Sequence, residues 1–244
     1  MPYTLSRFGF NEMMDCRSRI RSLFEDEPES LAAAAQRAVD FFYDELVDGE
    51  GRPACALVRF FKTHPFGDLP PELQEVARRT AAPEVPAASS RALTLLGTRG
   101  QEPDWNAPEL SRGHRAIPLL SVEMVEKAPM ISQLITQMGL AIATVVRPER
   151  ALLLERSDAT YNVFHVEQAL GSPHIVAQEE FVARYGIASV LGFGGLLSSG
   201  DLFAVIMFTK VPVPPEVADQ FRVIGLNLKI AILPFARKPL FPLL

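Results

Sequence analysis

The stretch EEFVARYGIASVLGFGGLLSSGDLFAVIMFTK, residues 179–210, decides how this chain folds. After a short helical turn at 181–185 come two apolar segments, 187–197 and 202–209, separated by the turn-forming sequence Ser-Ser-Gly-Asp at 198–201. This pattern predicts a β-hairpin. In the second segment the residues that alternate toward either face are all apolar, so this strand is expected in the middle of a sheet that is covered on both sides.

A long amphipathic helix is predicted directly after this hairpin. The sequence Pro-Val-Pro-Pro at 212–215 ends the second strand, and Pro215 suits the first turn of a helix. Apolar residues then recur at helical spacing: Val217, Phe221, Ile224, Leu228 and Ile232.

Residues 179–210, followed by PPEVADQFRVIGLNLKIAIL at 214–233, resemble the closing half of a GAF domain, a sensory module of bacterial signal transduction. Gly186-Ile187 and Gly200-Asp201-Leu202-Phe203 hold the positions that are typical of this family. The resemblance covers the last quarter of the chain closely and the rest in outline. It implies an α+β fold, with a GAF/PAS-like central antiparallel sheet. N- and C-terminal helices pack on one face, and loops and short helices cover the other.

Composition is that of an ordinary globular domain. The chain has 244 residues, of which 48% are hydrophobic and 22% charged, so it can bury a substantial core. Its net charge of -5 disfavours a nucleic-acid partner, and no apolar run reaches the length of a membrane span. Neither a secretory signal nor a metal-ligand spacing around the two cysteines, Cys16 and Cys55, is present, which favours the cytoplasm.

The remaining sequence supplies the other layers of the predicted domain. Helices are expected at 7–26 and 30–47, the second capped by Ser30, and at 71–79; Pro129 divides 121–139 into two short helices. The segment 81–90 has the composition of a linker within one domain. Strands are predicted at 54–61, 91–97, 141–146, 151–155 and 160–166. We expect an N-terminal helical extension at 1–28, the GAF-like domain at 29–236, and a tail or the start of a missing linker at 237–244.

A ligand pocket is implied by the resemblance, since GAF domains bind small molecules between one face of the sheet and the connections that cover it. Residues 105–182 have this covering role here. Trp105, the only tryptophan, is either an anchor for a long loop or a wall of the pocket. Such pockets are mostly apolar with a few polar contacts. The candidate ligand-binding residues are Tyr161, Phe164, His165, His174, Phe193 and Phe203.

A metal or haem site is the alternative. On a strand, His165 and Glu167 would share one face, and His174 follows nearby, so His165 with Glu167 or His174 could ligate a metal. His165 as a hydrogen-bonded, partly buried side chain explains the same pattern.

The sequence offers no set of residues that indicates an enzymatic activity. The cysteine set of the GAF-like methionine sulfoxide reductases is not reproduced, and no cysteine lies within a hundred residues of 171–174, where a bilin attachment would be expected. The glycines at 192–195 lack the Lys-Ser/Thr ending of a phosphate-binding loop. No catalytic residue is therefore assigned.

The sequence thus predicts a non-enzymatic sensory module that binds a small ligand and forms a homodimer through helices 30–47 and 215–233. Its output module, a histidine kinase or similar component of a two-component system, would lie on a missing extension or on another protein. A degenerate module that only dimerises is a further possibility.

Overall fold

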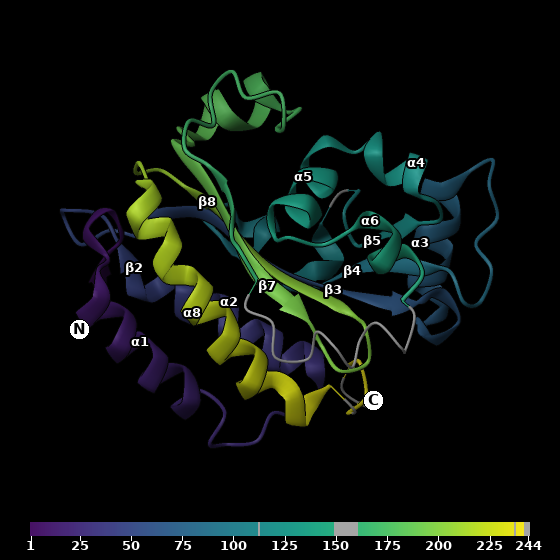
Figure 1. The fold of residues 1–244 in the computed structure, drawn as a ribbon, viewed down its shortest axis with the longest axis horizontal. Coiled ribbons are helices and arrows are strands. Elements are labelled where there is room, and N and C mark those ends of the chain that lie inside the picture. Colours follow the sequence, from purple (N-terminus) through teal and green to yellow (C-terminus); the bar gives the residue numbers. More distant parts are fainter. Residues whose placement is uncertain (112, 149–160, 237, 242–244) are drawn as a thin grey trace.

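The computed structural model describes residues 1–111, 113–148, 161–236 and 238–241, and its centre is a six-stranded antiparallel sheet (Figure 1). The strand order is β5-β4-β3-β8-β7-β6. The bounds are β3 Cys55–Pro65, β4 Arg91–Gly100, β5 Ala116–Leu119, β6 Phe164–Val166, β7 Ser189–Leu196 and β8 Leu202–Thr209. Two short parallel strands, β1 (Tyr3–Thr4) and β2 (Leu46–Val47), form a second sheet.

The predicted hairpin is confirmed. Strands β7 and β8 pair from Ser189 opposite Thr209 to Leu196 opposite Leu202, and every residue of both strands is buried. Their turn is closed by a hydrogen bond from Leu197 N to Asp201 O of 2.9 Å, and Gly200 takes the left-handed φ of +83° that this turn requires. Strand β8 lies between β3 and β7 in the middle of the sheet, where one layer of the fold covers each of its two apolar faces.

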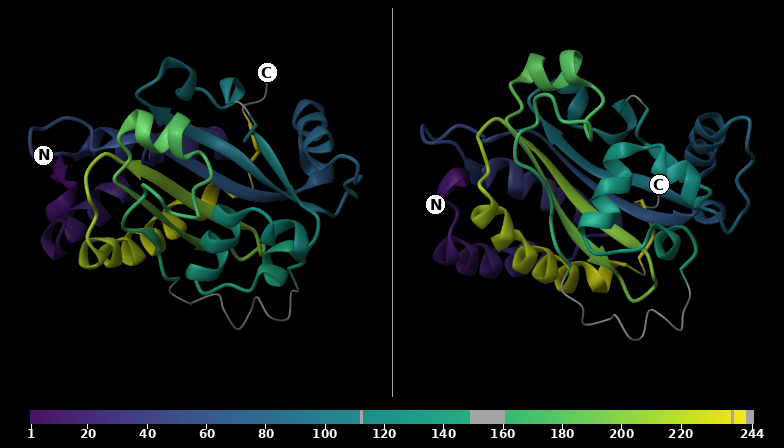
Figure 2. Two further views of the ribbon diagram at one scale, coloured as in Figure 1. Left: turned by 90° about the horizontal axis from the view of Figure 1, so that it is seen from above. Right: turned by 45° about the horizontal axis from the view of Figure 1, so that its top comes forward.

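Three helices form the layer on one face of the sheet. Helices α2 (Leu31–Glu45) and α8 (Pro215–Ile232) pack on the strands, and α1 (Phe10–Ser22) lies against α8 (Figures 1 and 2). Ser30 caps α2 as predicted, because its side chain accepts a hydrogen bond from Ala33 N at 3.0 Å. An aromatic cluster joins this layer to the sheet, with Phe193 of β7 packed at 5.1 Å on Phe42 and at 5.3 Å on Phe221.

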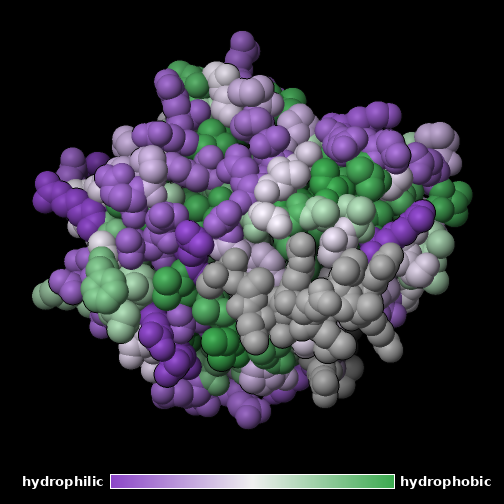
Figure 3. Space-filling view, viewed as in Figure 1, coloured by the Kyte–Doolittle hydropathy of each residue, from purple (hydrophilic) through white to green (hydrophobic). Residues whose placement is uncertain are grey.

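Short helices and loops cover the opposite face. They include α4 (Val122–Glu126), α5 (Pro129–Gln137) and α6 (Ile142–Val146), the 3-10 turns η3 (Pro103–Trp105) and η4 (Pro108–Leu110), and a π-helix, η5 (Gln178–Ala183). Pro129 begins α5, so the predicted division into two helices is confirmed. Figure 3 shows apolar residues gathered on the surface over α4 to α6. With helices on one face and short connections on the other, the predicted α+β architecture is confirmed.

The outer parts of the fold are short elements. Helix α3 (Pro71–Ala81) packs beside β5, and 3-10 turns form at η1 (Leu5–Arg7), η2 (Phe66–Asp68) and η6 (Leu233–Phe235). No helix in the described part of the chain is long and apolar enough to cross a membrane.

The strand predicted at 141–146 is wrong, because residues 142–146 of this segment are helical. Ile142, Val145 and Val146 of α6 are buried, and they follow the spacing of one helical turn. A short apolar run rich in β-branched residues does not by itself distinguish a strand from a buried helix. The strand predicted at 160–166 is limited to Phe164–Val166 in the described residues, and the one predicted at 151–155 lies outside them.

Candidate functional site

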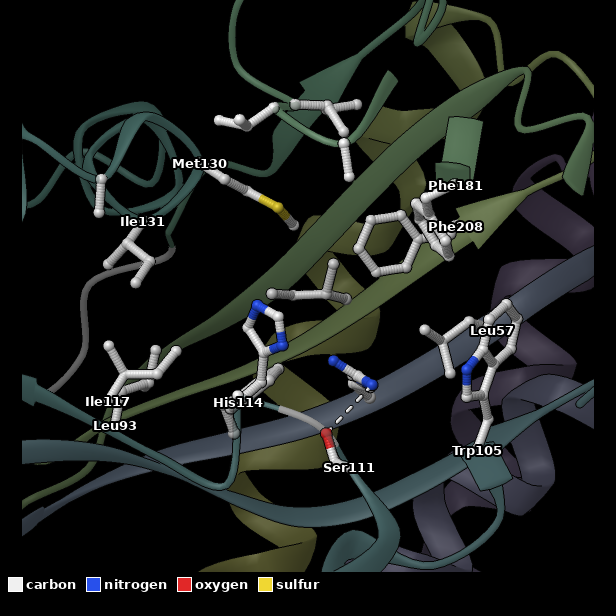
Figure 4. A pocket seen from close by; sticks show the side chains of 18 of the residues that line it. Leu57, Leu93, Trp105, Ser111, His114, Ile117, Met130, Ile131, Phe181 and Phe208 are labelled. Carbon is white, nitrogen blue, oxygen red and sulfur yellow. Dashed lines mark hydrogen bonds between the residues drawn. The ribbon is translucent and has the colours of Figure 1, made fainter. Parts of the chain in front are cut away.

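A cavity of about 920 Å³ lies between the sheet and the segments that cover it (Figure 4). Strands β3, β4, β5 and β8 supply its floor through Leu57, Phe61, Leu93, Ile117, Ile206 and Phe208. Met130 and Ile131 of α5 enclose it from the covering side. The cavity therefore occupies the face on which the sequence predicts a pocket, and its covering residues fall largely within the predicted range 105–182.

Trp105 is both anchored and part of the cavity wall. The Thr98 hydroxyl on β4 donates a hydrogen bond of 2.9 Å to the Trp105 carbonyl. Gly100 leaves room for the indole, because a Cβ at that position would lie 2.8 Å from Trp105 Cε3. The two interpretations of this residue are therefore compatible, since the contacts that hold the loop also place its ring beside the cavity (Figure 4).

An aromatic wall extends from Trp105 to the sheet. Trp105 packs edge to face on Tyr185 at 4.6 Å and on Phe181 at 5.7 Å, and Phe181 packs on Phe208 of β8 at 4.9 Å. Phe181 belongs to the π-helix η5, a rare conformation that is often found at functional sites. The wall offers flat apolar surface to a ligand, with ring geometry fixed by its own contacts.

Arg59 is the charged group on the cavity floor. It lies at the middle of β3, opposite Thr98 of β4 and Ile206 of β8. One guanidinium nitrogen donates to Ser111 Oγ at 3.3 Å (dashed line in Figure 4), while the buried Nε has no hydrogen-bond partner. Among the described residues no carboxylate forms an ion pair with Arg59, and burial lowers the pKa of its guanidinium to about 10. A cation without a counter-charge thus faces the cavity.

The opening of the cavity is bordered by side chains of mixed character. Leu110 and Val176 are apolar and largely exposed, at 51% and 79%. Charged side chains of both signs, Asp104 and Arg184, also line the cavity from exposed positions. The side chains at the opening therefore favour neither a positively nor a negatively charged ligand, whereas Arg59 on the floor favours a negatively charged one.

The six predicted ligand-binding residues are placed elsewhere, since none of them lines this cavity. Phe193 and Phe203 point to the helix layer, where Phe193 contacts α2 and α8 and Phe203 stacks on Phe60 at 5.8 Å. Phe164 is fully buried in the core beneath the covering segments, close to Gly192.

The other three predicted residues lie beside β7, in the edge strand β6 and in the loop after it. Tyr161 packs its ring on Gly195, where a Cβ would be only 2.4 Å from the ring. His165 makes a 2.8 Å hydrogen bond through Nε2 with the Val213 carbonyl, which agrees with the hydrogen-bonded interpretation. His174 lies in a loop, where its backbone N–H donates to Ser172 Oγ at 3.3 Å.

Metal binding through His165, Glu167 or His174 gains no support from this arrangement. The described residues contain no group of three or more His, Cys, Asp and Glu side chains that could hold a metal ion. Cys16 and Cys55 are buried and free, and burial raises the pKa of each thiol to about 12.

Arg59 is the residue that sequence reasoning missed, although the sequence carries a signal for it. The predicted strand at 54–61 reads Ala-Cys-Ala-Leu-Val-Arg-Phe-Phe, and a single arginine interrupts this apolar run. In a strand with two buried faces, alternation places Arg59 on the face of Leu57 and Phe61. A charge at such a position is rarely buried without a partner, which marks it as a functional candidate.

Comparison with known proteins gives structural neighbours. No family model matches the sequence, and no curated protein matches it either. Two solved structures are GAF domains of a phosphoenolpyruvate-protein phosphotransferase. The one from Coxiella burnetii has 10% identity and a TM-score of 0.44, covering 90% of this chain and 92% of that chain. The Acinetobacter one has 14% identity and a TM-score of 0.42, covering 91% and 94%.

A third neighbour is the phycocyanobilin-bound GAF domain of a cyanobacterial phytochrome, with 10% identity, a TM-score of 0.44 and coverage of 91% and 94%. At these values the likeness carries no further argument. The strand order and the two covering layers of the chain itself are those of the predicted α+β architecture with a central antiparallel sheet.

Proposed function

We propose that this chain is a non-enzymatic sensory module that binds a small, mainly apolar molecule in the cavity beside Trp105. The observation that supports this proposal is the cavity itself. Its volume of about 920 Å³ falls in the range of small-molecule sites, and its walls are mainly aromatic and aliphatic, with Arg59, Ser111 and His114 among the polar side chains. The GAF-like fold agrees with a regulatory role.

Binding would be transmitted through the sheet to the helices. Neighbouring residues of β3 serve both layers, because Arg59 faces the cavity while Phe60 stacks on Phe203 in the core of the helix layer. A ligand that favours one arrangement of this strand therefore also favours one packing of α2 and α8. We propose a population shift between two such packings as the signal.

The helix layer would contact a second copy of the chain and an output module. Phe10 and Met14 of α1 and Ile230 of α8 are exposed apolar side chains on this layer, at 66%, 43% and 54%. Since α1 covers part of α8, the proposed homodimer contact extends from α2 and α8 to α1. The output, a histidine kinase or similar, would act in cis or in trans, and the two free buried cysteines favour the cytoplasm.

Trp105 allows a direct test, because it is the only tryptophan and lines the cavity. Biphenyl-4-acetamide, a neutral apolar probe, is titrated into the protein while tryptophan emission is recorded, and calorimetry gives the Kd. Saturable binding is expected. Ala128 is a half-buried residue of the cavity wall, so the larger side chain of Ala128→Phe should occupy part of the cavity and weaken binding at least ten-fold. Ala87→Phe, at an exposed position away from the cavity, is the matched control and should leave the Kd unchanged.

Equal weakening by both variants, or no saturable binding of this probe or of its carboxylate analogue, would count against the proposal. Light scattering with and without the probe tests the dimer. A monomer under both conditions would remove the proposed dimer signal, while leaving the binding site intact.

A further inference from the structure

We infer that the ligand of this cavity is an apolar monoanion whose carboxylate pairs with the Arg59 guanidinium on the cavity floor. The inference rests on the proposed function and adds the chemical class of the ligand. It is carried by one arrangement, an arginine that has no ion-pair partner among the described residues and lines a largely apolar cavity.

The unpaired guanidinium is the unusual feature. A charge that is removed from water without a counter-ion costs several kcal/mol, so buried charges in proteins are normally paired. The surroundings of Arg59 supply no negative charge, since the cavity around it is lined by the apolar Leu57, Phe61 and Ile206 and by the imidazole of His114, and Ser111 supplies one long hydrogen bond. A group that enters through the cavity is therefore the natural source of the missing negative charge.

A carboxylate fits the donors that remain. Arginine presents a planar fork of N–H groups that can hold both oxygens of a carboxylate at once. The 3.3 Å bond to Ser111 uses Nη2, whereas Nη1 makes no hydrogen bond among the described residues and, unlike the fully buried Nε, is open to an acceptor. Carboxylate oxygens would also accept from the Ser111 hydroxyl, which can donate its proton while its oxygen still accepts from Arg59.

A single negative charge matches a single cation. A phosphate monoester would bring a second charge into the largely apolar cavity, where Arg59 is the only arginine or lysine on the floor among the described residues. The exposed His114 and Arg184 also line the cavity, but Asp104 and Glu102 line it as well. A dianion would thus remain partly uncompensated, and a monoanion is favoured.

The body of the ligand is expected to be flat or aliphatic rather than polar. Trp105, Phe181 and Phe208 form a fixed aromatic wall, and Met130 supplies an adaptable side chain opposite the floor (Figure 4). An aryl or branched alkyl chain would contact these residues while its acid group reaches Arg59.

The test compares probes that differ in one group. Biphenyl-4-acetate, biphenyl-4-acetamide and the phosphate monoester of biphenyl-4-methanol have nearly the same apolar body, with one, no and two negative charges. Each Kd is measured at pH 7.5 by calorimetry and by Trp105 emission. The acetate should bind at least ten-fold more tightly than the amide, and more tightly than the phosphate.

Arg59→Met keeps the length of the side chain and removes its charge. In this variant the preference for acetate over amide should disappear, whereas the Kd of the amide should change by no more than about three-fold. Arg184→Met is the control, because it removes an arginine at the opening and should retain the preference.

The outcomes separate the two proposals. If the amide binds as tightly as the acetate, or Arg59→Met keeps the preference, the ligand class is wrong and the binding function stands. Tighter binding of the phosphate would overturn the monoanion. If no probe binds, the proposed function itself fails.

A measurement without ligand tests whether Arg59 instead stabilises the fold. Because its guanidinium has no ion-pair partner among the described residues, Arg59→Met should unfold at a urea midpoint no lower than that of the wild type. A clearly lower midpoint would mean that Arg59 stabilises the fold, and it would overturn the inference.

Discussion

Asp201 should contribute more to stability than any residue that it pairs with, and this can be tested by replacing it with asparagine. Its carboxylate accepts from Lys62 Nζ at 2.8 Å on one oxygen and from Arg91 Nη1 at 2.6 Å on the other. The three side chains are only 11%, 4% and 12% exposed. Burial alone would raise the pKa of the Asp201 carboxyl, but the charge and hydrogen bond of Lys62 and the hydrogen bond from Ser199 lower it.

The magnitude follows from what each substitution leaves behind. Asp201→Asn keeps the shape of the side chain but leaves two buried cations without an anion, and breaking a buried pair in this way costs about 3–5 kcal/mol. Lys62→Met removes one cation and leaves Asp201 paired with Arg91, so about 1–2 kcal/mol is expected. The order of the two losses is the sharper prediction, because it does not depend on the absolute scale.

Urea unfolding at pH 7, followed by circular dichroism, measures both losses. Glu75→Gln is the matched control, since Glu75 also pairs one carboxylate with two arginines, Arg78 at 3.4 Å and Arg79 at 4.0 Å, but on an exposed helix. It should change stability by no more than about 0.5 kcal/mol. A loss below about 1 kcal/mol for Asp201→Asn, or a larger loss for Lys62→Met, would refute the reasoning.

Substitutions at three further positions have outcomes that unfolding experiments can check. Gly97→Ala should destabilise by about 1–3 kcal/mol, because its Cβ would lie 2.8 Å from the backbone carbon of Ala35 in α2; unchanged stability would contradict this packing. Ser30→Ala should cost about 1 kcal/mol through loss of the cap, whereas Ser30→Asn, which keeps an acceptor, should cost less. Burial, reinforced by the charge of Lys62, lowers the pKa of His64 to about 3 in the folded chain. In the unfolded chain the imidazole has its ordinary pKa of about 6.5, so between these two pH values the unfolded chain binds a proton that the folded chain does not. Stability should therefore fall by about 2–3 kcal/mol from pH 7.5 to 4.5 through this group, and His64→Leu should flatten that part of the urea-midpoint profile.

The hairpin and its neighbouring helix could be predicted from the sequence because local signals agree with long-range packing. Both faces of 202–209 are apolar and Pro215 marks the start of α8, so each local choice points to the same arrangement. Residues 141–146 lacked such agreement. This segment is too short for its hydrophobic periodicity to distinguish a strand from a helix, and its structure is the one that buries one helical face.

The cavity could be placed on the correct face of the sheet, but its residues could not be identified. Phe193 and Phe203 are aromatic residues of the predicted strands, and strand alternation alone does not say which face meets the helices. Trp105, Met130 and Phe181 come from three separate segments that meet only in the folded chain. Contacts between such segments depend on the conformation of the loops, which amino-acid composition predicts poorly.

Strand β3 carries two cations, the buried Lys62 and the half-buried Arg59, and their different surroundings separate a structural role from a binding role. Lys62 has Asp201 at 2.8 Å, so its charge is compensated by the chain itself and helps to hold the β7–β8 turn against β3. Arg59, three residues earlier, has only a serine and faces a cavity of about 920 Å³. A fold that supplies a carboxylate to one cation and withholds it from the other leaves the second charge for a ligand, and the apolar walls around Arg59 make that interaction stronger than it would be in water.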